Sequence, residues 1–98
     1  MKSQKDTHRV ADAEAIAVAV LGWLAGEPEL LSRFLALTGV APGEVRDAVN
    51  DRGFLIGLLD FLMGHEPTLM AFSAVSGTAP EAVVRAHDAL CGPPGGDF

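Results

Sequence analysis

The chain contains a gap-free internal repeat with a period of 38 residues, and this repeat restricts its fold more than any other feature. When residues 17–50 are aligned with residues 55–88, eleven of the 34 positions carry the same residue. The identical pairs are Leu21/Leu59, Leu24/Leu62, Gly26/Gly64, Leu31/Leu69, Phe34/Phe72, Ala36/Ala74, Gly39/Gly77, Ala41/Ala79, Pro42/Pro80, Val45/Val83 and Ala48/Ala86. Self-similarity at a fixed period of this length indicates a repeated supersecondary unit.

Each copy has the pattern of three short helices separated by glycine and proline. The first helices are expected over 11–25 and 54–63, apolar on almost every side. We expect Gly26 and Gly64 to end them in a left-handed conformation. Glycine then ends the second helices and proline begins the third, at Gly39, Gly77, Pro42 and Pro80. No β-branched alternation appears, so we predict an all-α fold of about six helices, built from two tandem copies of a three-helix unit.

The repeat also defines the expected domain organisation. We predict one helical domain over residues 10–91, with repeat copies at 17–50 and 55–88. Residues 1–9 are mostly polar, and residues 92–98 are rich in glycine and proline. We expect both segments to be flexible tails.

The charge distribution argues against several classes of partner. Residues 10–98 hold twelve carboxylates and four arginines, a net charge of −8, which repels phosphate backbones and anionic lipid. The longest uncharged apolar stretch near the N-terminus, residues 15–26, is too short to span a bilayer. We therefore predict neither nucleic-acid nor membrane binding. The single cysteine, Cys91, has no internal disulfide partner and favours a cytoplasmic location.

The segment 34–50 has the cadence of a helix-turn-helix, with Gly39 as the turn residue and 42–50 as the recognition helix. This keeps a DNA-binding regulator open as an alternative function. The expected recognition helix is acidic, however, since Glu44, Asp47 and Asp51 in and just after it oppose Arg46 and Arg52. The pattern fits an αα-corner, in which two helices pack at a steep angle, better than a DNA-binding motif.

No residue pattern indicates catalysis or metal binding. His87 and Cys91 stand four residues apart on one helical face, but two ligands do not make a metal site. No phosphate-binding glycine loop, C-x-x-C motif or local nucleophile–base pair is present in the sequence. We therefore predict a protein that is not an enzyme, with no catalytic residue, no cofactor and no metal.

The two apolar first helices favour a role in binding. Few polar-faced helices are available to cover them, so we expect an exposed apolar patch at the start of the second one. The candidate interaction surface is Phe54, Leu55, Leu58, Asp60 and Phe61. Asp60 either anchors a partner there or marks the solvent-facing line of the helix. We predict a protein–protein interaction module that forms a homodimer or binds another protein. A carrier of a small apolar ligand, held between the two central helices, is the other alternative.

The phrases LSRFLALTGVAPGEVR and FLIGLLDFLMGHEPTLMAF resemble a family of short alphaproteobacterial proteins of unknown function, each about 100 residues long. The resemblance covers about residues 10–91, and its most recognisable blocks are FLALTG and LDFL. It implies a cytoplasmic all-helical protein. It transfers no catalytic residues, because the family has no known activity.

Overall fold

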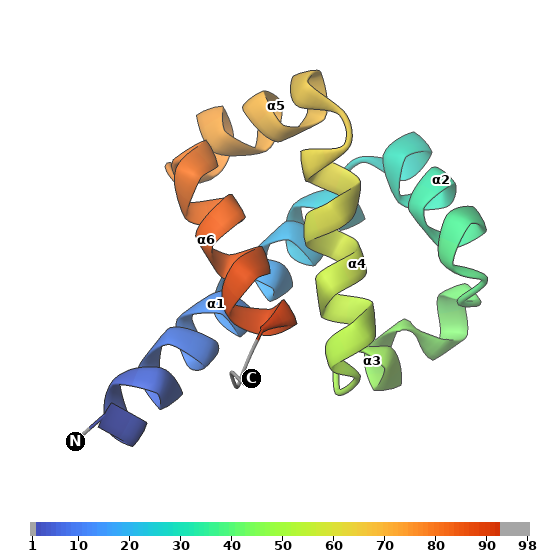
Figure 1. Ribbon diagram of the computed structural model, residues 1–98. Coiled ribbons are helices and arrows are strands. Elements are labelled where there is room, and N and C mark those ends of the chain that lie inside the picture. The colour runs from blue at the N-terminus through green and yellow to red at the C-terminus, as the bar shows by residue number, and fades with distance from the viewer. Residues whose placement is uncertain (1, 93–98) are drawn as a thin grey trace.

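Six α-helices and one short 3-10 helix make up the described part of the chain in the computed structural model (Figure 1). The structure describes the backbone of residues 2–92 and the side chains of residues 9–92. In chain order the elements are α1 (Lys2–Ala25), α2 (Pro28–Thr38), the 3-10 helix η1 (Pro42–Glu44), α3 (Val45–Ala48), α4 (Arg52–Met63), α5 (Glu66–Ser76) and α6 (Pro80–Cys91). No strand occurs between residues 2 and 92, so the all-α fold is confirmed.

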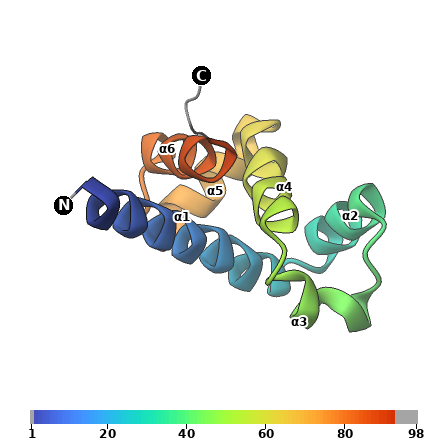
Figure 2. The ribbon, with the colours of Figure 1, turned by 60° about the horizontal axis from the view of Figure 1, so that its bottom comes forward.

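Three helices form the centre of the molecule. α6 lies across α1 and also packs on α4, and α1 contacts α4 directly (Figures 1 and 2). α2 flanks α1 and α4, and α5 flanks α4 and α6. The largest side chains that this arrangement removes from water are Phe34, Phe72, Leu24, Leu58, Leu59, Leu62, Leu90, Val20 and Val83. Their burial is the main apolar contribution to folding.

The second helix of each copy ends in a left-handed glycine. Gly39 has a φ of 77° and donates its N–H to the carbonyl of Leu35 at 2.8 Å. Gly77 has a φ of 78° and donates to the carbonyl of Ser73 at 3.0 Å. Glycine adopts this conformation without the steric penalty that a Cβ atom brings, so both helices stop where the sequence predicts.

The left-handed conformation expected for Gly26 and Gly64 is wrong. In the described chain positive φ occurs only at the two glycines that end α2 and α5, and Gly64 has a φ of −78°. The reason is that the next helix begins at once. The N–H of Glu27 bonds to the carbonyl of Leu24 at 2.8 Å, and that of His65 to Leu62 at 3.1 Å. These tight turns keep the backbone in the right-handed region, so no reversal is needed.

α1 begins nine residues earlier than the position 11 predicted from apolar periodicity. Residues 2–9 contain neither glycine nor proline, so nothing in this segment stops the helix from extending over it. The flexibility expected for residues 1–9 stays a prediction. At the other end, Gly92 donates its N–H to the carbonyl of Asp88 at 3.0 Å and ends α6. The rest of the expected C-terminal tail, residues 93–98, lies outside the described residues.

The third elements of the two copies differ in length. α6 has 12 residues, whereas η1 and α3 together reach only from Pro42 to Ala48. Asp51 explains why α3 ends early. Its carboxylate accepts a hydrogen bond from the N–H of Gly53 at 3.0 Å and caps α4. The chain must therefore leave α3 before that point, while nothing constrains α6 in the same way.

Candidate functional site

The surface expected around the start of α4 does not exist in the folded chain. Phe54, Leu55 and Leu58 are exposed by only 6%, 4% and 0%, and Phe61 is half-buried. The physical reason is that α1, α2, α5 and α6 all pack on α4 and together cover it. Phe34 of α2 contributes directly, with its ring 5.5 Å from that of Phe54. Phe54, Leu55 and Leu58 therefore belong to the hydrophobic core and do not form an exposed apolar surface.

Asp60 is the one exposed member of that set, and it pairs with a residue of α6. Its side chain is 62% exposed, and Oδ1 accepts a hydrogen bond from Nε2 of His87 at 2.7 Å. The His87 side chain is only 19% exposed, and its Nδ1 lies 3.9 Å from Oδ1 of Asp88. Asp60 therefore joins α4 to α6 at the surface, a role that neither sequence interpretation of this residue included.

Cys91 lies beside the same histidine but in a geometry that does not suit proton transfer. Its Sγ is 3.8 Å from Nδ1 and 3.7 Å from Nε2 of His87. Because the two distances are nearly equal, the sulfur does not lie along the lone pair of either nitrogen. Among the described residues, no group of three or more His, Cys, Asp or Glu side chains is placed to hold a metal ion.

The corner between α2 and α3 lacks the long second helix of a DNA-binding helix-turn-helix. Gly39 does form the turn, as expected. The segment expected as the recognition helix, 42–50, instead contains η1 and the four-residue α3. Glu44 is turned back onto the backbone, with Oε1 accepting the N–H of Ala41 at 3.0 Å. A single turn of helix offers few side chains to a DNA groove.

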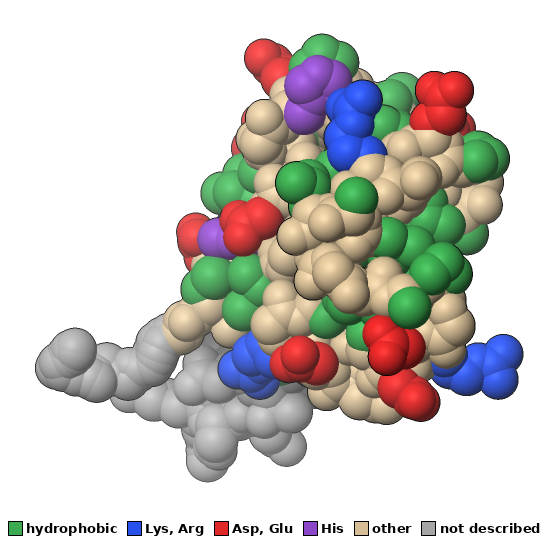
Figure 3. Space-filling model, turned by 90° about the vertical axis from the view of Figure 1, so that its right-hand side faces the viewer, with side chains coloured by type: hydrophobic (Ala, Val, Ile, Leu, Met, Phe, Trp, Pro, Cys, Tyr) green, Lys and Arg blue, Asp and Glu red, His purple; other side chains and the backbone are tan. Residues whose placement is uncertain are grey.

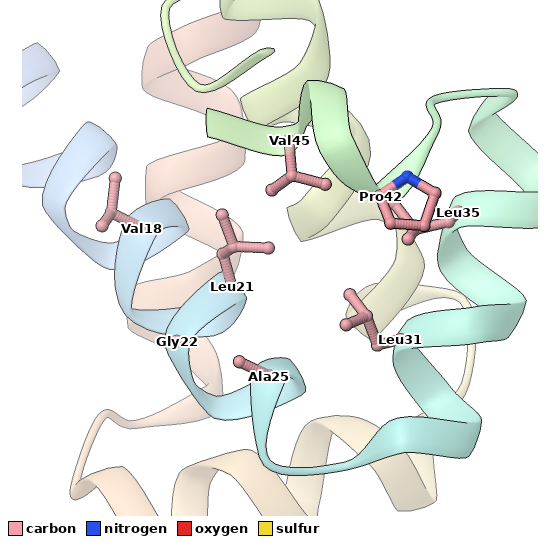
Figure 4. Close-up of a pocket in the computed structure, with 8 residues that line it drawn as sticks. All are labelled: Val18, Leu21, Gly22, Ala25, Leu31, Leu35, Pro42 and Val45. Carbon is pink, nitrogen blue, oxygen red and sulfur yellow. The ribbon is translucent and has the colours of Figure 1, made fainter. Parts of the chain in front are cut away.

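An apolar hollow lies between α1, α2 and the η1–α3 segment (Figure 4). Its volume is about 420 Å³, and its lining contains only apolar side chains and one glycine. The lining residues are Val18, Leu21, Gly22, Ala25, Leu31, Leu35, Pro42 and Val45. In Figure 4 the side chains of Leu21, Leu31 and Val45 reach toward a common space from three elements, and Val18 lies at its outer edge on α1.

The hollow is open to solvent on the α1 side. Val18 is 49% exposed, and Gly22, Ala25 and Pro42 are also exposed. Leu35 is the only lining residue that is buried, with 9% of its surface exposed. Figure 3 shows the side of the molecule that carries α2 and α3, where apolar side chains lie among acidic and basic ones. The protein therefore presents apolar side chains on a concave surface.

Two small residues on α1 account for the empty volume. Gly22 and Ala25 stand where the second copy has Asp60 and Met63. A Cβ atom built on Gly22 would meet no atom within 4 Å. α6 also packs closely on α4 in the second copy, whereas α3 makes no extensive contact with α1 within the described residues. Sequence reasoning missed this site because the signal is the absence of large side chains at two positions.

None of the described helices combines the length and the apolar character needed to cross a membrane. The fold and the hollow together define a class of protein: a small all-α domain with an open apolar site and no cluster of chemically reactive side chains in it. Residues 10–93 match the family described as "Protein of unknown function (DUF3572)", and the chain belongs to this family. The alphaproteobacterial range expected from the resemblance stays a prediction.

No curated protein and no solved structure matches the chain at a significant level.

Proposed function

We propose that this protein is a non-enzymatic helical interaction module whose apolar hollow receives side chains from a partner protein. The observation that carries the proposal is the lining of the hollow, where no residue has a polar side-chain atom. Half-exposed side chains such as Val18 gain free energy when a partner removes them from water. The partner is a second copy of the chain or another protein. The single cysteine supports the reducing cytoplasm as the location.

The placement of the ionisable side chains supports binding over catalysis. No side chain in the lining of the hollow takes up or releases a proton. The pair formed by Asp60 and His87 joins α4 to α6, neither of which lines the hollow. General acid–base chemistry needs a proton-transfer group within hydrogen-bond reach of the substrate, and a molecule bound in the hollow meets none in its lining.

The size of the hollow also favours a second candidate, a carrier of a small apolar ligand. About 420 Å³ falls within the range of about 300–1,000 Å³ typical of small-molecule pockets. The apolar lining suits an aliphatic chain. Native mass spectrometry of the protein purified without detergent distinguishes the two functions, because a carrier retains a ligand of defined mass.

We also propose that the chain arose by duplication of a three-helix unit, and reciprocal aromatic contacts support this origin. Phe34 of the first copy contacts Phe61 of the second, with ring centroids 5.4 Å apart and an interplanar angle of 63°. The repeat pairs Phe34 with Phe72 and Trp23 with Phe61. The reciprocal contact, Trp23 with Phe72, has a centroid distance of 5.7 Å and an angle of 64°. A twofold relation between the copies accounts for both contacts.

Under this interpretation the hollow is the place where the two copies diverged. α6 is long enough to pack between α1 and α4, and α3 is too short to make the equivalent contact. The first copy therefore keeps an open space between its three elements, bordered by Gly22 and Ala25. The asymmetry supports a binding role, since a fully packed first copy would be the more stable arrangement.

The interaction is tested by placing a charge in the hollow and an equal charge elsewhere. Val18→Lys puts an ammonium group among the lining residues, and Val84→Lys is the matched control. Val84 is 40% exposed on α6, outside the hollow, against 49% for Val18. Light scattering measures self-association of both variants. Affinity capture with mass spectrometry identifies other partners, which are then purified and titrated.

We expect the wild type and Val84→Lys to form the same complex, and we expect Val18→Lys not to form it. A complex that Val18→Lys leaves intact, or a monomer for which no partner depends on Val18, overturns the proposed function. Circular dichroism of both variants checks that each retains the helical content of the wild type.

A further inference from the structure

We infer that the partner segment is a basic amphipathic helix, with an aliphatic face that enters the hollow and lysine or arginine beside that face. This inference rests on the proposed function and names the chemistry of the partner. The lining of the hollow indicates the shape of the partner segment, and the side chains at the edge of the hollow indicate its charge. Both are properties of the N-terminal half of the domain, residues 10–50.

The lining of α1 matches the length of two helical turns. Val18, Leu21, Gly22 and Ala25 follow the spacing i, i+3, i+4, i+7, which forms one stripe along the helix about 10 Å long. Helices that bind in apolar grooves use anchor side chains with this same spacing. The absence of a side chain on Gly22 leaves space for a large aliphatic residue of the partner at the middle of the stripe.

Three carboxylates lie on the elements that border the hollow, at positions close to its lining. Glu14 precedes Val18 by four residues on α1, so the two share a helix face. Glu27 occupies the N-cap position of α2, four residues before Leu31, and its side chain makes no cap hydrogen bond. Glu44 lies between two lining residues of the η1–α3 segment. All three are exposed, and none forms an ion pair with a described residue.

The basic side chains of this half of the molecule do not balance those carboxylates. Residues 10–50 contain six carboxylates and two arginines, a net charge of −4. Arg33 lies two residues from both Leu31 and Leu35, so it points away from the face of α2 that lines the hollow. Arg46 follows the lining residue Val45, and it is one positive charge against three carboxylates near this edge. An acidic partner helix meets like charges at this edge, whereas a basic one is attracted to it.

The same charges argue against an anionic lipid surface as the occupant, because the acidic edge repels lipid phosphates. A second copy that docks hollow to hollow is also disfavoured, since both hollows carry the same charges. A separate basic helix satisfies both the apolar lining and the acidic edge.

Three labelled peptides of about 18 residues, five turns of helix, test the inference. The first has leucine on one face and lysine beside it, and the second keeps the leucines but replaces lysine with glutamate. The third keeps the lysines but replaces leucine with serine. Fluorescence anisotropy measures the Kd of each peptide for four proteins: wild type, Val18→Lys, Val84→Lys and the triple variant Glu14→Gln/Glu27→Gln/Glu44→Gln. Glutamine at 44 still accepts the N–H of Ala41, so the turn at η1 is preserved.

We expect the leucine–lysine peptide to bind wild type and Val84→Lys at least about tenfold more tightly than either other peptide at low salt. At about 0.5 M salt, the difference in Kd between the leucine–lysine and leucine–glutamate peptides should become smaller. With the triple variant, most of this difference in Kd should disappear. Val18→Lys should weaken the binding of both leucine peptides.

Each contrary outcome points to a different conclusion. Equal binding of the two leucine peptides overturns the basic partner and leaves the proposed function standing. Equal binding of the two lysine peptides shows attraction by charge alone and overturns docking in the hollow. A wild-type dimer that Val18→Lys abolishes makes a second copy the occupant and overturns this inference alone. If neither leucine peptide binds and Val18→Lys affects no complex, the proposed function fails as well.

Discussion

Phe34 and Phe61 meet edge to face in the core, with ring centroids 5.4 Å apart and planes inclined by 63°. Phe34 comes from α2 and Phe61 from α4, so this contact joins the two halves of the chain. Edge-to-face pairs of this kind contribute about 0.5–1.5 kcal/mol beyond the area they bury. A second aromatic contact also joins the two halves: the ring centroids of Trp23 and Phe72 are 5.7 Å apart. Phe34 and Phe72, which the sequence repeat aligns, are both buried, and each makes an edge-to-face aromatic contact.

The first prediction is that Phe34→Ala and Phe72→Ala destabilise the protein by similar amounts, each about 3–5 kcal/mol. Both rings are 1% exposed, so each substitution removes a fully buried side chain and leaves a cavity. Urea unfolding followed by circular dichroism gives the two free energies. Leu37→Ala is the control, because Leu37 is 73% exposed and its loss should change stability by less than about 0.5 kcal/mol. A near-neutral result for either phenylalanine contradicts the equivalence of the two copies.

The second prediction concerns the glycines that end α2 and α5. Gly39→Ala and Gly77→Ala should each cost about 1–2 kcal/mol, because an L-residue is strained at a φ near +77°. A Cβ atom at either position meets nothing within 4 Å, so the cost comes from the backbone alone. Gly43→Ala serves as a control, since its φ is not positive and its Cβ is also unobstructed. Thermal unfolding should separate the first two variants from the third, and a tolerated Gly39→Ala or Gly77→Ala would count against the assigned turn.

Much of the helical arrangement could be predicted because proline and glycine mark it locally. Pro28 and Pro67 lie in the first turns of α2 and α5, and two left-handed glycines end these helices. The start of α1 was not predictable in the same way. Its first turns carry no apolar stripe, and helix formation there depends on continuity with the buried part.

The location of the candidate site was harder to predict, because it depends on which helices become neighbours. The sequence indicates that α4 is apolar on nearly all sides, but that pattern fits an exposed interface and a buried central helix equally well. The packing of α1, α2, α5 and α6 on α4 decides between them, and Leu58 is fully buried. The hollow arises at Gly22 and Ala25, where small residues leave no periodic signal. The hollow depends on where α2 and α3 lie relative to α1.

The third prediction is that the hydrogen bond between Asp60 and His87 contributes little to stability. Its distance is short, 2.7 Å, but the Asp60 side chain is 62% exposed, so water competes for the carboxylate. A double-mutant cycle with Asp60→Asn and His87→Gln should give a coupling of at most about 1 kcal/mol. Added salt should reduce any coupling further. A coupling of several kcal/mol would mean that this contact is a principal link between α4 and α6.

The last prediction concerns Gly22, which lies inside α1 where glycine is unfavourable. Alanine in a helix interior is more stable than glycine by about 0.5–1 kcal/mol, and a Cβ here meets no atom within 4 Å. Gly22→Ala should therefore raise the midpoint of urea unfolding. Gly22→Leu should also fold, because its side chain extends into the hollow. It should nevertheless weaken binding of the leucine–lysine peptide by occupying the space that the peptide needs.

The control for Gly22→Leu is Ala19→Leu, an exposed position on α1 outside the lining of the hollow. It adds an aliphatic side chain to the same helix and should leave peptide affinity unchanged. If Gly22→Leu stabilises the protein and binds the peptide as well as Ala19→Leu does, the hollow is not where the peptide docks. If Gly22→Ala destabilises the protein, the space above Gly22 is filled in solution. Stability gained together with binding lost would indicate that glycine at this position serves the open hollow at the expense of the helix.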